Sequence, residues 1–353
     1  MFLLDSHCDT PSQILRLRDL AVDNEYAHVD FPKLRRGGVD GAFFALYTPA
    51  SLSETESYVY ASKLLSGVRS VLNFHKDKAR LATCRSEAYK NQSDGLFSIF
   101  LGLENGTVIG KEIDRLYEFY DAGVRYVTLC HSRDNQICDS CAQGGTWKGL
   151  SPFGKELVRH MNRLGMLVDV SHISDNSFYD VLATSSRPVV ATHSCCRALC
   201  DHPRNMTDDM IRELAAAGGV IQINFYPLFL DGGFRSVLES SGIMEEGERI
   251  EAEFIADPAS STKRAAWNRV QDQLTALERP SFRLIADHID RVVELVGIDH
   301  VGIGSDYDGI EVTPFGMEDI SKMPLLFEEL RSRGYTESDL SKIASQNFFR
   351  ILG

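Results

Sequence analysis

Six apolar runs in this chain end in a side chain suited to metal binding or acid–base chemistry. The residues at these ends are His7 with Asp9, Glu104, His131, His172, His193 and Asp306. One such residue alone is as often a hydrogen-bonded core group as a functional one, whereas six together exceed what packing requires. Neutral imidazoles and carboxylates, without thiolates, suit Zn2+ or another borderline divalent metal with one position left to water. The pattern therefore predicts a metal centre.

The spacing of these residues indicates how the ligands divide. His7 and Asp9 are two residues apart, so on an extended segment both side chains point to the same side. His172 and His193 close the segments DVSH and ATHS, each of which follows an apolar run. Glu104 lies between these two groups in strand order, and a carboxylate has two oxygens with which to bridge two metal ions. We therefore expect Glu104 to be the shared ligand.

Cysteine chemistry is the main alternative. Cys138 and Cys141 have Cys-x-x-Cys spacing, but a structural zinc would need a second pair. The candidates for that pair are Cys195, Cys196 and Cys200. Because adjacent cysteines have poor geometry for one metal ion, we interpret the Cys-x-x-Cys as a chance spacing in a loop. Cys8 and Cys130 are not expected to be nucleophiles, because a sequence neighbour in a strand, here a histidine, faces the opposite side.

The elements that must position these side chains alternate between short apolar runs and longer stretches of helical periodicity. Strands are predicted at Phe2–Asp5, Gly41–Tyr47, Phe97–Leu103, Val124–Cys130, Met166–Val170, Pro188–Thr192, Val220–Phe225 and Val301–Gly304. Helices are predicted at Glu56–Arg80, Lys111–Ala122, Gly154–Leu164, Ser174–Thr184, Asp208–Ala217, Ala265–Val296, Glu318–Arg333 and Glu337–Arg350. Ser151-Pro152 and Thr207-Asp208 are typical helix starts.

Near-continuous apolar strands indicate a parallel sheet that helices cover on both faces. Eight strands favour a (β/α)8 TIM-like barrel, with a doubly wound open sheet as the alternative. No G-x-G-x-x-G follows an early strand, so a dinucleotide-binding sheet has no support. In a barrel all strands end on one face, where we expect a binuclear metal site. We predict a single barrel domain over residues 1–353, with a polar insertion around 228–264 that is either a lid or a solvated loop.

Composition excludes several classes of protein. Of the 353 residues, 43% are hydrophobic and 25% are charged, which rules out a disordered or collagen-like chain. The net charge of −13 argues against nucleic-acid and anionic-lipid partners. The start MFLLDSHCD has no signal-peptide pattern, and no apolar run or end segment predicts a membrane span or lipid anchor. We therefore expect a cytoplasmic protein with reduced thiols and no membrane partner.

Eight segments carry a resemblance to a known family. They are DSHCDTP near the start, GLENG at 102–106, TLCHSRDN at 128–135, DVSH at 169–172, THS at 192–194, HPRNM at 202–206, GIGSDYDG at 302–309 and QNFFRIL at 346–352. In this order they resemble the renal or membrane dipeptidase family, a branch of the metal-dependent amidohydrolase superfamily. Animal members carry a signal peptide, disulfides and a lipid anchor, so this chain looks like a bacterial-type soluble member.

The resemblance implies a zinc-dependent dipeptidase with two Zn2+ ions per chain. By this likeness His7 and Asp9 look like ligands of one zinc, and His172 and His193 like ligands of the other. Glu104 would bridge both ions. Several other binuclear amidohydrolases use a carboxylated lysine as the bridge, so Glu104 favours the dipeptidase branch. The implied activity is hydrolysis of the peptide bond of dipeptides, with tolerance of a D-residue at the C-terminal position.

Three more residues match the family's motifs. His131 and Arg204 resemble its substrate-contacting histidine and arginine, and Asp306 resembles its active-site aspartate. His131 would stabilise the developing oxyanion. Asp306 would move a proton from the nucleophile to the leaving amine, or would instead bind the substrate's ammonium group. Arg204 would bind the substrate's terminal carboxylate, or would be a surface arginine paired with Asp201 or Asp208.

Two rival functions and several residues stay open. The first rival is another binuclear amidohydrolase, such as a deaminase, a lactonase or an N-acyl amino acid hydrolase. The second is a non-catalytic barrel, which the complete set of ligands disfavours. A homodimer is expected only by analogy with the family. Asp308 matches a motif position without a catalytic role, and His202 is not assigned. The histidines expected at the surface are His28, His75, His160, His288 and His300.

Overall fold

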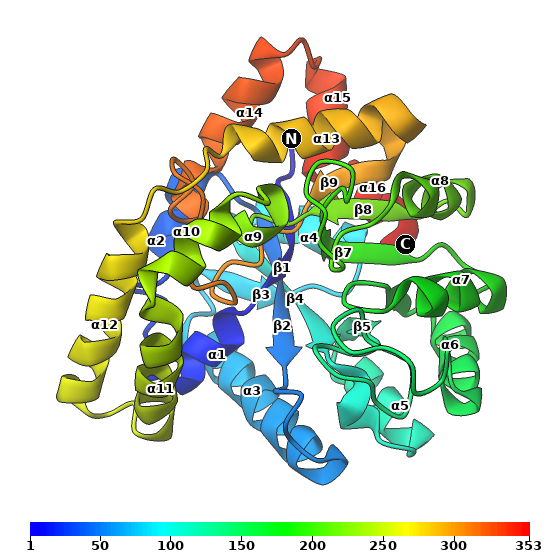
Figure 1. Ribbon diagram of the computed structural model, residues 1–353, viewed down its shortest axis with the longest axis horizontal. Coiled ribbons are helices and arrows are strands. Elements are labelled where there is room, and N and C mark those ends of the chain that lie inside the picture. The colour runs from blue at the N-terminus through cyan, green and yellow to red at the C-terminus, as the bar shows by residue number, and fades with distance from the viewer.

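A computed structural model describes residues 1–353, and its centre is one parallel sheet (Figure 1). The strands pair in the order β1-β2-β4-β5-β6-β7-β8-β9. Their bounds are Leu4–Cys8 (β1), Gly41–Tyr47 (β2), Phe97–Glu104 (β4), Val124–Thr128 (β5), Leu167–Asp169 (β6), Val190–Ser194 (β7), Val220–Ile223 (β8) and Val301–Ile303 (β9). A bridge between Cys8 and Tyr307 joins the end of β1 to the segment after β9. The sheet thereby closes on itself. The predicted (β/α)8 barrel is confirmed, and the open sheet is wrong.

Helices surround this barrel (Figure 1). They are Thr10–Leu15 (α1), Phe31–Gly37 (α2), Glu54–Phe74 (α3), Arg85–Ser93 (α4), Ile113–Asp121 (α5), Pro152–Leu164 (α6), Asp175–Thr184 (α7), Asp208–Ala216 (α8), Pro227–Leu230 (α9), Phe234–Ser241 (α10), Ile243–Ala256 (α11), Ser261–Thr275 (α12), Arg283–Val296 (α13), Met323–Ser332 (α14), Glu337–Ser341 (α15) and Asn347–Leu352 (α16). The side chain of Ser151 accepts a hydrogen bond from the Gly154 amide and so caps α6. Thr207 caps α8 in the same way, through the Met210 amide. Both helix starts agree with the sequence prediction.

The interior of the barrel is lined by apolar side chains near the amino ends of the strands and by polar side chains nearer their carboxyl ends. The apolar cluster includes Phe43, Phe100, Tyr126, Leu167, Val190 and Val220, together with Phe348 and Phe349 of α16. The C-terminal helix therefore closes this end of the barrel. Because strand side chains alternate, residues two positions further along also face inward. Three of these are the buried polar residues Thr128, Asp169 and Thr192.

Two predicted helices differ from the structure. The helix expected at Glu56–Arg80 ends at Phe74, and Ala79–Leu81 forms a short strand, β3, that pairs with β4 outside the barrel. The helix expected at Ala265–Val296 is two helices, α12 and α13. Pro280 lies between them, and proline both lacks the amide that a helix needs and restricts the residue before it. The sequence pattern also does not predict α1, α2 and α4.

The segment around 228–264 is helical, so its interpretation as a solvated loop is wrong. It contains α9, α10, α11 and the start of α12, between β8 and β9. These helices have a small core of their own, whose residues are Phe234, Leu238, Phe254, Trp267, Val270, Leu274 and Val312. An ion pair of 2.7 Å joins Glu251 of α11 to Arg16, the residue after α1. The segment is thus packed beside the barrel as a folded unit.

Candidate metal centre and active site

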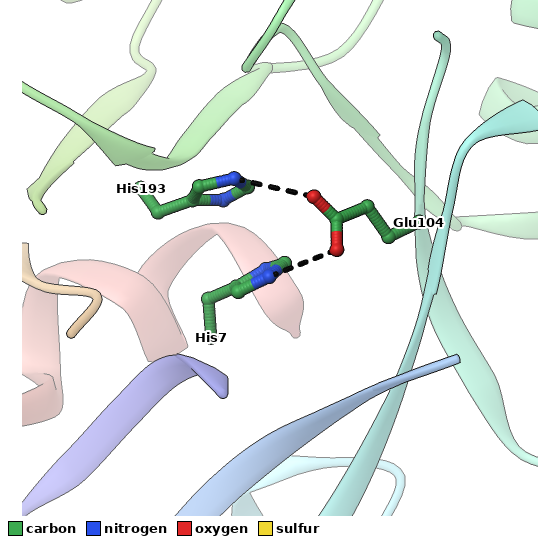
Figure 2. Close-up of side chains that lie close together, drawn as sticks. All are labelled: His7, Glu104 and His193. Atoms are coloured by element: carbon green, nitrogen blue, oxygen red, sulfur yellow. Dashed lines mark ion pairs between the residues drawn. The ribbon is translucent and has the colours of Figure 1, made fainter. Parts of the chain in front are cut away.

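The carboxyl ends of the strands bring the predicted ligands together around Glu104, the last residue of β4. Its Oε2 lies 3.2 Å from His7 Nε2. Its Oε1 lies 3.1 Å from His172 Nε2 and 3.4 Å from His193 Nε2. Figure 2 shows the carboxylate facing His7 with one oxygen and His193 with the other. Asp9 Oδ2 is 3.5 Å from His7 Nε2, so His7 and Asp9 share one side of Glu104.

Two atoms of this cluster that could bind a metal ion lack hydrogen-bond partners, as expected of ligand atoms. His7 Nε2 and Asp9 Oδ1 are buried and unpartnered. The Nε2 atoms of His172 and His193 face each other at 2.9 Å. Three groups of ligand atoms are close enough to hold an ion: His7, Glu104 and His193; Glu104, His131 and His172; and His7, Asp9 and Asp306. Imidazole nitrogens and carboxylate oxygens suit zinc, so the residues fit a metal centre, although these groups divide them differently from the prediction.

Burial and charge shift the pKa values of these groups in different directions. Burial raises the pKa of the Asp9 carboxyl well above its usual value, and the charge of Glu104 raises it further. Burial acts in the same direction on Glu104, but the charge of His7 and the close contacts with His172 and His193 outweigh it and hold the pKa of Glu104 well below the usual value. Burial lowers the pKa of His172 and His193 well below the usual value. Both imidazoles are therefore neutral, the form that binds metals.

Irregular strand pairing aims two of these residues at the site. The register shifts in β1 around His7 and in β7 around His193. Such irregularities re-aim side chains. Cys8 packs away from the site, as predicted, with its Sγ donating to the Phe43 carbonyl oxygen at 3.3 Å. All eight cysteines are free thiols, and none belongs to a candidate metal group.

Asp306 lies three residues beyond β9, in a loop with left-handed backbone. Asp306 has a φ of 65° and Asp308 a φ of 66°. The Asp308 carboxylate accepts hydrogen bonds from the His28 amide at 2.7 Å and the Thr10 hydroxyl at 2.8 Å, which hold the loop. Asp306 Oδ2 accepts from Asn224 Nδ2 at 2.9 Å. Burial raises the pKa of the Asp306 carboxyl. Asp308 therefore shapes the loop, and Asp306 faces the cluster.

Arg204 is buried beside the cluster without a carboxylate partner. It is 5% exposed, and its Nε atom has no hydrogen-bond partner. Nη1 donates to Ser194 Oγ at 2.8 Å, and Nη2 donates to the His193 carbonyl oxygen at 2.7 Å. Asp208 pairs with Arg291 instead, so the surface-arginine alternative is wrong. A buried positive charge without a counter-ion is costly, which makes this position suited to an anionic ligand.

His131 faces the cluster from the loop after β5. Its ring centre lies 4.1 Å from that of His172 and 4.9 Å from that of Tyr47. Its Nε2 is 3.9 Å from Glu104 Oε1, and its Nδ1 is buried without a partner. Burial lowers the pKa of His131. A neutral imidazole in this place can donate one hydrogen bond to a ligand.

Sequence patterns did not identify some residues around the site. Asn224 follows β8 and orients Asp306, but the predicted strand Val220–Phe225 includes it, so the strand-end criterion did not select it. The Tyr126 hydroxyl lies 2.9 Å from His7 Nδ1, and a tyrosine inside an apolar strand gives no such signal. His288 was expected at the surface but is 1% exposed. It shares the buried face of α13 with Ile285, Ile289 and Val292, and this helical spacing was the available signal.

Comparison with known proteins identifies the family of this chain. A model of the membrane dipeptidases, peptidase family M19, matches residues 1–353. The chain belongs to this family. Dipeptidase verJ of Clonostachys rogersoniana is 30% identical to it over 367 residues, which cover 99% of this chain and 83% of that protein. The resemblance inferred from the motifs is confirmed.

Solved structures share the barrel of this family member. The probable dipeptidase PvdM from Pseudomonas aeruginosa matches with a TM-score of 0.82 at 24% identity, covering 100% of this chain and 95% of that one. A metallopeptidase from Rhodobacter sphaeroides, solved with a phosphinate mimic of the dipeptide L-Ala-D-Ala, matches with a TM-score of 0.81 at 23% identity, covering 100% and 98%. In this dipeptidase-family chain, no helix is both long and apolar enough to cross a membrane.

Proposed function

We propose that this protein is a zinc-dependent dipeptidase that hydrolyses the peptide bond of dipeptides. The observation that carries the proposal is the buried guanidinium of Arg204, which has no carboxylate partner and lies beside the cluster around Glu104. A planar guanidinium suits bidentate recognition of a carboxylate. When Arg204 holds the terminal carboxylate of the substrate, the scissile bond is the last peptide bond of the chain.

Two zinc ions per chain are the proposed cofactor. His7 and Asp9 would hold one ion, and His172 and His193 the other. Glu104 would bind both, because its two oxygens face these two groups. At such a site divalent ions supply an activated water near neutral pH and polarise a carbonyl group.

Three side chains carry the remaining steps in this proposal. Arg204 orients the substrate through its carboxylate. His131 donates a hydrogen bond to the carbonyl oxygen as negative charge develops there. Asp306, oriented by the Asn224 amide, takes a proton from the attacking water and delivers it to the leaving amine. The alternative role for Asp306 is to bind the ammonium group of the substrate.

Amidation of the substrate tests this function. An amidated dipeptide keeps the scissile bond but lacks the negative charge, so kcat/KM should fall about tenfold to a thousandfold, as for loss of a charged hydrogen-bond pair of about 1.5 to 4 kcal/mol. Arg204→Lys should lose a similar factor with the free dipeptide, because an ammonium cannot reproduce the planar fork. Arg291→Lys, the same change at an arginine paired with Asp208, should keep wild-type activity. Equal turnover of free and amidated dipeptides would contradict the proposal.

A substrate panel then separates this function from its rivals. L,L- and L,D-dipeptides should be hydrolysed, the latter because the relative from Rhodobacter sphaeroides binds a mimic of L-Ala-D-Ala. Turnover of N-acyl amino acids, lactones or amino-heterocycles, with no turnover of dipeptides, would indicate another amidohydrolase. Metal analysis of the same sample identifies the ions. The cytoplasmic location, the homodimer and the single barrel domain stay predictions.

A further inference from the structure

A buried carboxylate, that of Asp169, is linked to His193 through one hydroxyl group. Asp169 is the last residue of β6, is fully buried and forms no ion pair. Its Oδ1 accepts from the amides of Ser171 and Thr192, each at 3.0 Å. Its Oδ2 accepts from the hydroxyls of Thr128 at 2.5 Å and Thr192 at 2.7 Å. All four hydrogen bonds are thus donated to the carboxylate.

The hydroxyl of Thr192 also contacts the imidazole of His193, with 2.8 Å between Oγ1 and Nδ1. A hydroxyl group has only one hydrogen to donate. Because Thr192 donates this hydrogen to Asp169, its oxygen can only accept a hydrogen bond from His193. His193 therefore carries its proton on Nδ1. The lone pair of Nε2 is then directed into the cluster, 3.4 Å from Glu104 Oε1.

We propose that Asp169 and Thr192 are positioning residues that fix the tautomer and ring orientation of His193 for metal binding. This inference rests on the proposed metal centre. In metal sites, the partner of the second ring nitrogen orients the ligand and raises its basicity. The register shift in β7 allows the adjacent residues Thr192 and His193 both to face the barrel interior. Asp169 of DVSH and Thr192 of THS are not ligands themselves, and positioning His193 is the role that we assign to them.

Thr128 provides a matched control for Thr192. Its hydroxyl donates to the same oxygen of Asp169, and it is equally buried, but it forms no hydrogen bond with His193. Thr128→Val and Thr192→Val each remove one hydrogen bond from Asp169 at nearly constant volume. Only Thr192→Val breaks the link to the imidazole, whereas Thr192→Ser keeps the hydroxyl. The comparison therefore separates positioning of His193 from support of Asp169.

Chelator competition for Zn2+ on the full-length protein is the first measurement. Thr192→Val should bind one of the two ions about 10- to 100-fold more weakly, whereas Thr128→Val and Thr192→Ser should stay within about threefold of the wild type. Wild-type affinity in Thr192→Val would overturn the proposal. An equal loss in Thr128→Val would also overturn it, because the effect would then come from Asp169 and not from the link to His193.

Histidine-ring 15N spectra of the full-length protein are the second measurement. In the wild type the ring proton of His193, assigned with His193→Gln, should reside on Nδ1. A proton on Nε2 would overturn the proposal even if Thr192→Val did not fold. Neither measurement uses dipeptide hydrolysis. A wild type that binds zinc with this tautomer but cleaves no dipeptide would contradict the proposed function and support the positioning role. A wild type that binds no zinc would overturn both.

Discussion

The carboxylate of Glu104 lies between His7 on one side and His172 and His193 on the other, so both of its oxygens are engaged. Glu104→Gln keeps the shape of the side chain but replaces one oxygen by an amide NH2, which donates hydrogen bonds and offers no lone pair to a metal ion. We therefore expect Glu104→Gln to weaken both sites and to hold fewer than two divalent ions per chain in elemental analysis. Glu294→Gln, the same change at an exposed helix position, should keep wild-type metal content. Full metal content and activity in Glu104→Gln would contradict the bridging role.

Asp306 is proposed to transfer a proton, whereas the five ligands are proposed to bind metal ions. Asp306→Asn keeps the shape and a partner for Asn224 but removes the base, so kcat should fall about a hundredfold or more. Metal content should barely change, because the five proposed ligands are intact. Both quantities are measured on one preparation. Loss of metal would instead identify Asp306 as a ligand, which its position near His7 and Asp9 would explain.

Residue types and spacing predicted the cluster because parallel strands carry their last residues to one face of a barrel. His7 and Glu104 are 97 positions apart in sequence, yet both follow from this rule. Tyr126 does not follow from it, because its role depends on which side chain of another strand lies opposite. For Arg204, the choice between a substrate-binding residue and a surface residue required the burial of its side chain. That burial depends on how the loops pack over the barrel. Sequence therefore identified ligand types better than it identified their partners.

Strands were predicted more closely than helices because each strand is a short apolar run with turn residues at its ends. The predicted and observed bounds of β2 are the same, Gly41–Tyr47. Helix ends depend on caps and on single residues such as Pro280, which an extended periodic pattern conceals. The sequence of the insertion alone did not show that it folds. Its small core includes Val312, which lies beyond the insertion in the chain.

The loop after β9 allows a sharp test of how backbone positions the site. A Cβ atom on Gly309 would lie 2.1 Å from Asp9 Oδ2 and 2.8 Å from Asp306 Oδ1, so Gly309→Ala must displace both carboxylates. We expect kcat/KM to fall about tenfold to a hundredfold, the effect of a misplacement of about 1 Å. Gly232→Ala, where no atom lies within 4 Å of the added Cβ, should retain activity. Wild-type kinetics in Gly309→Ala would show that the loop adjusts freely.

His288 connects the barrel to the helical insertion in the folded molecule. On α13, its Nδ1 accepts from the Cys196 amide, just after β7, at 3.0 Å. Its Nε2 lies 3.3 Å from the carbonyl oxygen of Leu230 in α9, to which it donates. A neutral imidazole has one donor and one acceptor, and both are used here. Burial lowers the pKa of His288 to about 4, although the nearby charge of Asp287 acts in the opposite direction.

The stability of the whole molecule should therefore depend on pH through His288. A histidine in the unfolded chain binds its proton near pH 6.5, whereas the folded protein has a pKa of about 4. Between these values the unfolded state holds one more proton, so the contribution of His288 is fully present above pH 6.5 and is lost as the pH falls toward 4. The free energy of unfolding falls by about 1.4 kcal/mol per pH unit from this residue, or about 3 kcal/mol in all. His288→Asn places an amide oxygen near the position of Nδ1 without a titrating group. In urea unfolding experiments its stability should fall less steeply than that of the wild type over this range, and parallel curves would contradict the role of His288.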